Sequence, residues 1–201
     1  MKQVKLLVIA SLIAVLGIAP SVYAASTPAT PPAGSTAESR LKQRKAEREI
    51  KLDEKDTKRL TQTCVAAQSK IRTIYQSATT ALTERNKAFY RADAKLWVII
   101  GRLKLADRDT YALEKQRTNF AQQIADFQTT SNNFTQVLDD MQVLNCAADP
   151  VGFKALLETA KIYRSQVVSK SNAIRDYAVN DIKKTLTEHT TARQPKTEET
   201  Q

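Results

Sequence analysis

Apolar residues recur every three or four positions along three long stretches of the chain, with polar breaks between them. The first stretch carries a stripe from Leu60 to Leu103, and the third carries one from Phe153 to Leu186. In the second, large apolar side chains return every seven residues: Leu113, Phe120, Phe127, Phe134 and Met141. This spacing predicts coiled-coil-like helices that bury one face against partner helices. We expect helices at about 60–104, 110–144 and 150–188.

Two short breaks separate the predicted helices. Asp107, Asp109 and Thr110 are turn and cap formers, and Asp149 followed by Pro150 is a strong helix start. Short connections place consecutive helices side by side in opposite directions. The chain also has only 4 glycines, too few for a turn-rich β fold. The sequence therefore predicts an all-α, elongated antiparallel three-helix bundle, up-down-up in connectivity, formed by residues 60–188.

The two cysteines fit this arrangement. If the chain folds back near residue 106, the position of the first helix that is level with Cys146 lies at about residue 66. The other cysteine is Cys64. We therefore predict an intramolecular disulfide between Cys64 and Cys146; two buried free thiols, or bridges between chains, are the alternatives.

Residues 1–24 have the parts of a secretory signal: a basic start, an apolar run from Leu6 to Ile18, and small residues before Ala25. We expect cleavage before Ala25. An uncleaved membrane anchor is the alternative, although the run is shorter than the roughly 20 residues of a span. Residues 25–34, rich in Pro, Ser and Thr, predict a flexible linker. The chain is thus expected to be exported, to the cell envelope or beyond it.

Residues 35–59 alternate charges and lack a sustained apolar stripe. We expect a charged, solvated helical extension that projects past the bundle, supported by Glu–Lys and Glu–Arg pairs. A binding arm is the alternative, because nine basic residues stand there against six acidic ones and the whole chain carries a net charge of +10. Such an arm would bind polyanions weakly and without sequence-specific recognition of nucleic acid, since no aromatic residues are interspersed to stack bases. The tail 189–201 has no stripe and is expected to be disordered.

One polar residue, Arg85, interrupts the first stripe. By the same register it is level with Ser131 and Asn132 and near Gln166, which predicts a polar layer in the core. Arg85 reaching out to solvent is the alternative.

The run from Leu96 to Ile100 is apolar on more than one face. Trp97 and Val98 step off the main stripe and are candidates for contact with a partner or a membrane. Core packing against Ile182 and Leu186 is the alternative.

Catalysis is not expected. The single histidine, His189, cannot supply the paired Glu-x-x-His motifs of a di-iron bundle or a His-rich zinc site. The glycines form no phosphate-binding loop and no Gly-x-Ser-x-Gly motif. Asp139 and Asp140 are adjacent on the second helix, which we interpret as part of a solvated face. No catalytic residue, metal or cofactor is therefore predicted.

Two stretches carry a resemblance to a known group. They are CVAAQSKI from Cys64 and NCAADPVGFKALLETA from Asn145. Together with the signal and the linker, they resemble exported helical proteins of the reduced-genome Patescibacteria, Saccharibacteria among them, over about Cys64 to Lys184. The resemblance implies a cell-envelope or secreted setting and brings no activity and no binding residues.

We expect a non-enzymatic structural or interaction protein whose partner is another protein or a cell-surface component. A holdase-type chaperone is one alternative, because export, basic charge and the stretch EKQRTNFAQQIADFQ from Glu114 resemble the Skp/OmpH chaperones. In those, helical hairpins surround unfolded outer-membrane proteins. This chain has no predicted strands for their oligomerisation core and adds a predicted disulfide. Attachment to polyanions through residues 35–59 is the other alternative. The pattern does not specify an oligomeric state.

Overall fold

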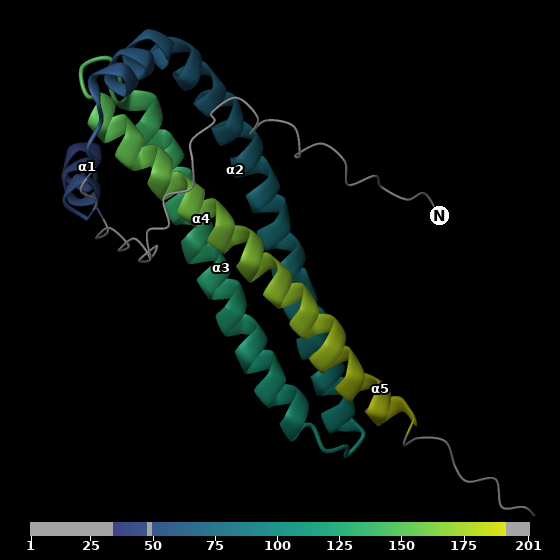
Figure 1. Ribbon diagram of the computed structural model, residues 1–201. Coiled ribbons are helices and arrows are strands. Elements are labelled where there is room, and N and C mark those ends of the chain that lie inside the picture. The colour runs from purple at the N-terminus through teal and green to yellow at the C-terminus, as the bar shows by residue number, and fades with distance from the viewer. Residues whose placement is uncertain (1–33, 48–49, 192–201) are drawn as a thin grey trace, which may run out of the picture.

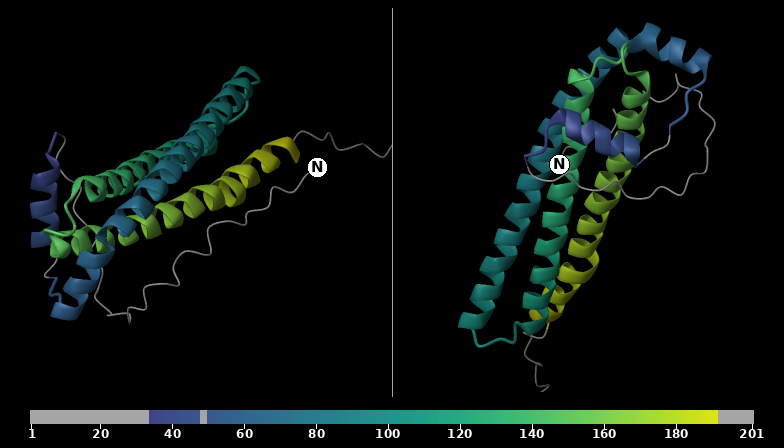
Figure 2. Two further views of the ribbon diagram at one scale, coloured as in Figure 1. Left: turned by 90° about the horizontal axis from the view of Figure 1, so that it is seen from above. Right: turned by 90° about the vertical axis from the view of Figure 1, so that its left-hand side faces the viewer.

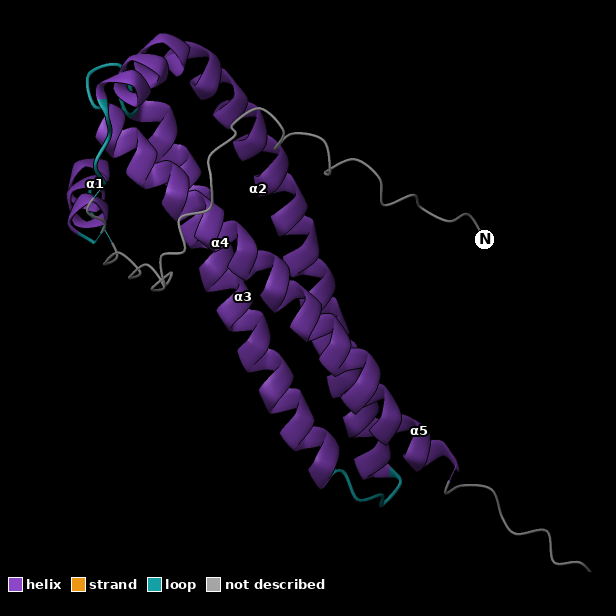
Figure 3. Ribbon diagram, in the orientation of Figure 1, coloured by secondary structure: helices purple, strands orange, loops and turns teal. Residues whose placement is uncertain are grey.

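The structure, a computed structural model, describes residues 34–47 and 50–191, and this part of the chain contains helices, turns and loops but no strand. Figures 1 and 3 show the elements in order along the chain. They are α1 (Ala37–Ala46), α2 (Glu54–Leu105), α3 (Tyr111–Val143), α4 (Pro150–Tyr177), the π-helical turn η1 (Ala178–Ile182) and α5 (Lys183–Thr191). The all-helical class is confirmed. The signal segment 1–24, nearly all of the linker 25–34 and residues 192–201 of the tail lie outside the described residues.

Three long helices, α2, α3 and α4, lie side by side along the length of the molecule (Figures 1 and 2). Helix α3 packs against both α2 and α4, whereas α2 and α4 meet over a much smaller region. The seven-residue stripe of α3 is accordingly buried: Leu113, Phe120, Phe127 and Met141 are at most 2% exposed, and Phe134 is 7% exposed. The core therefore follows α3, with a partner helix on each side of it.

Helix α2 is the longest element, at 52 residues, yet few of its side chains are buried. Those are Cys64, Ile71, Leu82, Leu96 and Ile100. Much of its stripe is only half-buried or exposed, because α3 alone covers α2 over most of its length. One broad side of α2 thus faces solvent.

Contacts between α2 and α3 fix their relative direction. Cys64 forms a disulfide with Cys146, just beyond the end of α3, with their Cα atoms 5.7 Å apart. Towards the other end of α2, Asp93 accepts a hydrogen bond from Arg117 at 2.9 Å. Residue numbers that rise along α2 therefore meet numbers that fall along α3, so the two helices run in opposite directions. The predicted disulfide is present in the structure.

The predicted helix boundaries need two corrections. The first bundle helix begins at Glu54 instead of near residue 60, because Asp53 caps it by accepting a hydrogen bond from the Asp56 N–H at 2.6 Å. At the other end, the last helix continues to Thr191, so residues 189–191 are not part of a disordered tail.

The π-helical turn η1 keeps the last helix in contact with α3. Eight residues of uninterrupted α-helix would leave Ile182 about 80° away from the buried face of Ile174. The wider π turn takes up part of that rotation, and Ile182 is 6% exposed. Beyond it, Thr185 accepts a hydrogen bond from the Gln116 side chain of α3 at 2.8 Å.

The first prediction concerns the disulfide. Its two cysteines are 82 residues apart, and closing a loop of that length stabilises the fold by about 4 kcal/mol in the chain-entropy model. Reduction should therefore lower the melting temperature, measured by circular dichroism, by on the order of 10 °C. The double variant Cys64→Ser, Cys146→Ser should melt like the reduced protein and should not respond to reductant. Equal melting of the oxidised and reduced wild type would contradict the prediction.

Candidate functional site

Helix α1 does not project from the molecule. It lies across the end of the bundle where the disulfide is, packed against α4, and Leu41 contacts the core (Figures 1 and 2). We expected residues 35–59 to form a solvated extension that projects past the bundle, and this is wrong because α1 packs against the bundle. The extension is two separate pieces, because residues 54–59 are the first turns of α2. Its cations are not all solvated, because three of them reach acidic residues of α3 and of the loop before α4.

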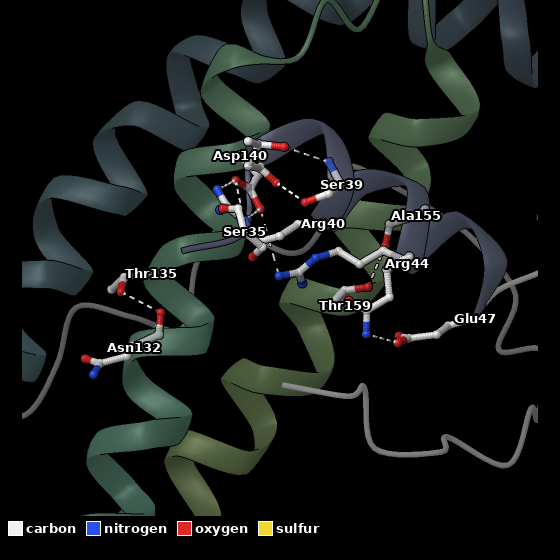
Figure 4. A network of polar contacts seen from close by, with 12 residues as sticks. Ser35, Ser39, Arg40, Arg44, Glu47, Asn132, Thr135, Asp140, Ala155 and Thr159 are labelled. Atoms are coloured by element: carbon white, nitrogen blue, oxygen red, sulfur yellow. Dashed lines mark hydrogen bonds and ion pairs between the residues drawn. The ribbon is translucent and has the colours of Figure 1, made fainter. Parts of the chain in front are cut away.

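The first of these contacts is a buried ion pair between Arg40 and Asp140. The Arg40 Nε atom donates to both carboxylate oxygens of Asp140, at 3.0 and 3.2 Å, and Nη2 donates to one of them (Figure 4). Hydrogen bonding to Asp140 raises the pKa of Arg40 above its usual value. Asp140 is 3% exposed. The interpretation of Asp139 and Asp140 as one solvated face is therefore wrong for Asp140, although Asp139 is exposed.

Arg44 lies one turn further along α1 on the same side and is 3% exposed. Among the described residues, the carboxylate closest to it is that of Asp140, with Nη2 3.9 Å from Oδ2. Burial lowers the pKa of Arg44, and the Asp140 charge opposes this shift only in part. The nearby Thr159 hydroxyl donates to the Ala155 carbonyl at 2.8 Å rather than engaging Arg44 (Figure 4).

A third contact ties α1 to the start of α4. Lys45 Nζ lies 2.7 Å from Asp149 Oδ2. The other oxygen of Asp149 caps α4 by accepting from the Gly152 N–H at 2.8 Å. Burial alone would raise the pKa of Asp149, but these two hydrogen bonds outweigh it and hold the pKa below its usual value. One carboxylate therefore both begins α4 and holds the end of α1.

The loop between α3 and α4 is fixed by polar contacts as well as by the disulfide. The Asn145 side chain accepts from the N–H groups of Ala147 and Ala148, at 3.2 and 3.1 Å. From α2, the Gln68 side-chain amide donates to the Leu144 carbonyl at 2.6 Å. We define the junction as this loop together with α1, its ion pairs and the disulfide. The junction brings together α1, α2, α3 and α4.

The predicted polar core layer does not form. Arg85 and Asn132 are exposed, Gln166 is half-buried, and Ser131 alone of the four is buried, at 2% exposure. Helix α3 covers α2 over most of its length and α4 meets α2 in only a small region, so Arg85 stays exposed. The alternative, an arginine that reaches solvent, describes Arg85.

The apolar run from Leu96 to Ile100 divides between core and surface. Leu96 and Ile100 are 4% and 1% exposed, whereas Trp97 and Val98 are 55% and 51% exposed. The Arg117 guanidinium lies over the Trp97 ring, 4.6 Å from its centre, and is held there by its ion pair with Asp93 at 2.9 Å. One face of Trp97 is thus covered by a cation, and the rest of the ring is open. Whether Trp97 and Val98 contact a partner stays a prediction.

Sequence reasoning missed the acidic half of the junction. Arg40 and Asp140 are 100 residues apart, and no local pattern links them. A weak signal was present, because Arg40, Leu41 and Arg44 lie on one face of a helix, which is the pattern of a short amphipathic segment.

Within the described residues, no group of histidine, cysteine, aspartate and glutamate is arranged to hold a metal ion. In the same part of the chain, no helix has the length and apolar character needed to cross a membrane. The fold and the junction thus define an all-helical, disulfide-linked protein. Comparison with known proteins found no matching family model, no similar curated protein and no similar solved structure.

Adjacent aspartates provide a test of the buried ion pair. Asp140→Ala leaves Arg40 and Arg44 at the junction without their carboxylate, which should cost up to about 3 kcal/mol. The loss is limited by the free energy that docks α1, because α1 can leave the bundle. Asp139→Ala, at the exposed neighbouring position, should change stability by less than about 0.5 kcal/mol. Urea denaturation measures both, and equal effects of the two substitutions would contradict the structure.

Two glycines provide a second matched pair. A Cβ at Gly152 would lie 2.3 Å from Asp149 Oδ2, so Gly152→Ala should displace the cap and its contact with Lys45. A Cβ at Gly101 would meet nothing within 4 Å. We expect Gly101→Ala to stabilise the protein by up to about 1 kcal/mol, the ordinary helix-propensity gain. Gly152→Ala should instead destabilise it by about 1 kcal/mol. A gain in melting temperature for both would show that the cap is dispensable.

Proposed function

We propose that the protein is a non-enzymatic, exported structural or interaction protein, a disulfide-linked up-down-up helical rod that acts in the cell envelope or outside the cell. The disulfide between Cys64 and Cys146 is the observation that carries this proposal. Disulfides persist in oxidising, extracytoplasmic settings and are rare in reducing ones. The predicted signal over residues 1–24 and the resemblance to exported patescibacterial proteins support the same setting.

The proposed contact surface is the open side of α2 near its C-terminal end. Trp97 and Val98 are about half exposed there, and Tyr90, two turns earlier on the side of Trp97, is 47% exposed. Tryptophan is favoured as an interface anchor because it buries a large area at a low cost in conformational entropy. The Arg117 side chain against the ring holds Trp97 in one orientation, which lowers that cost further.

The polyanion alternative loses support from the ion pairs of α1. Arg40 and Lys45 are paired with Asp140 and Asp149, and Arg44 is buried. Fewer cations of residues 35–59 therefore remain to attract a polymer than the sequence alone indicated. Any such attraction should be weak and should decrease steeply as salt is added.

The fluorescence of Trp97, the only tryptophan, tests the contact surface. In the isolated protein its emission should be that of a partly hydrated ring, and acrylamide should quench it. On addition of solubilised proteins of the native cell surface, the emission should shift to the blue and the quenching should decrease. Burial of the ring by a partner would cause both changes.

Two substitutions on one side of α2 act as test and control. Val98→Asp places a charge beside Trp97 and should abolish the response. Thr80→Asp lies on the same side of α2, about five turns away, and should leave it unchanged. A response to a chemically unfolded protein would instead support a holdase, and a response only to anionic polymer at low salt would support polyanion attachment. No response to any of the three would contradict a contact at Trp97.

A further inference from the structure

The junction holds an excess of buried positive charge. The side chains of Arg40, Arg44 and Asp140 are 11%, 3% and 2% exposed. Asp140 accepts its hydrogen bonds from Arg40, and Asp149 is paired with Lys45 outside this group. Two guanidinium groups thus share one carboxylate. An arginine stays protonated in proteins, so the carboxylate of Asp140 balances only one of the two charges at hydrogen-bond range, while Glu47 and Asp139 act on them through their charge alone.

The same residue also lacks hydrogen-bond acceptors. Nε, Nη1 and Nη2 of Arg44 are all buried, and none makes a hydrogen bond to the described part of the chain, since the 3.9 Å distance from Nη2 to Asp140 is longer than a hydrogen bond. Buried polar groups are nearly always paired, and an unpaired charged one is costly. The hydroxyl of Ser35, just before α1, is also buried and has no hydrogen-bond partner among residues 34–47 and 50–191. Figure 4 shows Ser35, Arg40 and Arg44 grouped around Asp140.

We infer that Arg44 binds a small oxyanion, such as phosphate, sulfate or a carboxylate group, where α1 meets α3 and α4, and that α1 shifts to admit it, because the Arg44 nitrogens are enclosed in this structure. A guanidinium donates two parallel hydrogen bonds to the oxygens of such a group, which supplies both the missing charge and the missing acceptors. Asp140 remains paired with Arg40, so the oxyanion does not replace it. The inference is independent of the proposed contact at Trp97, which lies in α2 outside the junction.

Oxyanion binding should be coupled to the docking of α1, because α1 carries Arg44. An oxyanion that binds only when α1 is docked raises the ratio of docked to released molecules. At ten times its dissociation constant, the increase is about elevenfold. Amide hydrogen exchange across residues 37–46 reports this ratio directly.

The experiment compares hydrogen exchange of the full oxidised chain in phosphate and in chloride at equal ionic strength. Phosphate should slow exchange in residues 37–46 by up to about elevenfold and leave the middle of α3 unchanged. A second arm replaces inorganic phosphate with long-chain polyphosphate. A response to inorganic phosphate identifies a free ion as sufficient, and a response to polyphosphate alone identifies a polymer-borne phosphate. Equal exchange in all three solutions would overturn the inference.

Variants separate this site from general salt effects. Arg44→Met should abolish the response, whereas Arg85→Met, an exposed arginine of α2, should retain it. If Arg44→Met releases α1 altogether, Asp140→Asn is decisive, because it retains the Arg44 donors and removes the competing carboxylate. Phosphate should then protect residues 37–46 at least as strongly as in the wild type. Loss of the response in Asp140→Asn, or its persistence in a docked Arg44→Met, would also overturn the inference.

Discussion

Helix α2 depends on the disulfide more than any other element does, because it has so few other partners. A helix of 52 residues that touches α3 on one side gains little burial per turn, and most of its side chains stay in contact with water. The bond from Cys64 to Cys146 fixes it near its beginning, while the short connection at residues 106–110 fixes its end. These two connections determine which residues of α2 lie beside which residues of α3. Burial of the α3 stripe follows from that pairing and from α4 on the other side.

The junction fixes a further part of the fold, the position of α1. A buried ion pair such as Arg40 with Asp140 repays its desolvation only when the geometry is good, so it specifies a position more than it adds stability. Here it specifies where α1 lies, a helix too short and too polar to be stable by itself in water. Asp149 acts on two helices at the same time, because one of its oxygens caps α4 and the other binds Lys45 of α1.

Local patterns predicted the parts of the fold that repeat. The spacing of Phe120, Phe127 and Phe134 predicted α3, and counting equal numbers of residues on either side of the turn placed Cys64 beside Cys146. The errors arose where burial depends on distant segments. Arg85 occupies a core position of the α2 repeat but is exposed, because α2 meets α4 over only a small region, and the repeat of one helix does not encode where a third helix lies. The charges of α1 appeared solvated because their partners come 100 residues later, in Asp140, and 104 residues later, in Asp149.

Helices α2 and α3 form a hairpin that is closed by the turn at residues 106–110 and by the disulfide between Cys64 and Cys146. The two arms of this hairpin, from the turn to each cysteine, must therefore have matching lengths. Inserting one residue in α2 between Cys64 and Leu105 would move the cysteine by about 1.5 Å along the helix and rotate it by about 100°. Cys64 would then face away from Cys146. An insertion in one arm must therefore be balanced by one of equal length in the other, and whole repeats of the stripe keep both apolar faces in place. The helices of this hairpin are consequently free to vary in surface composition but not in relative length.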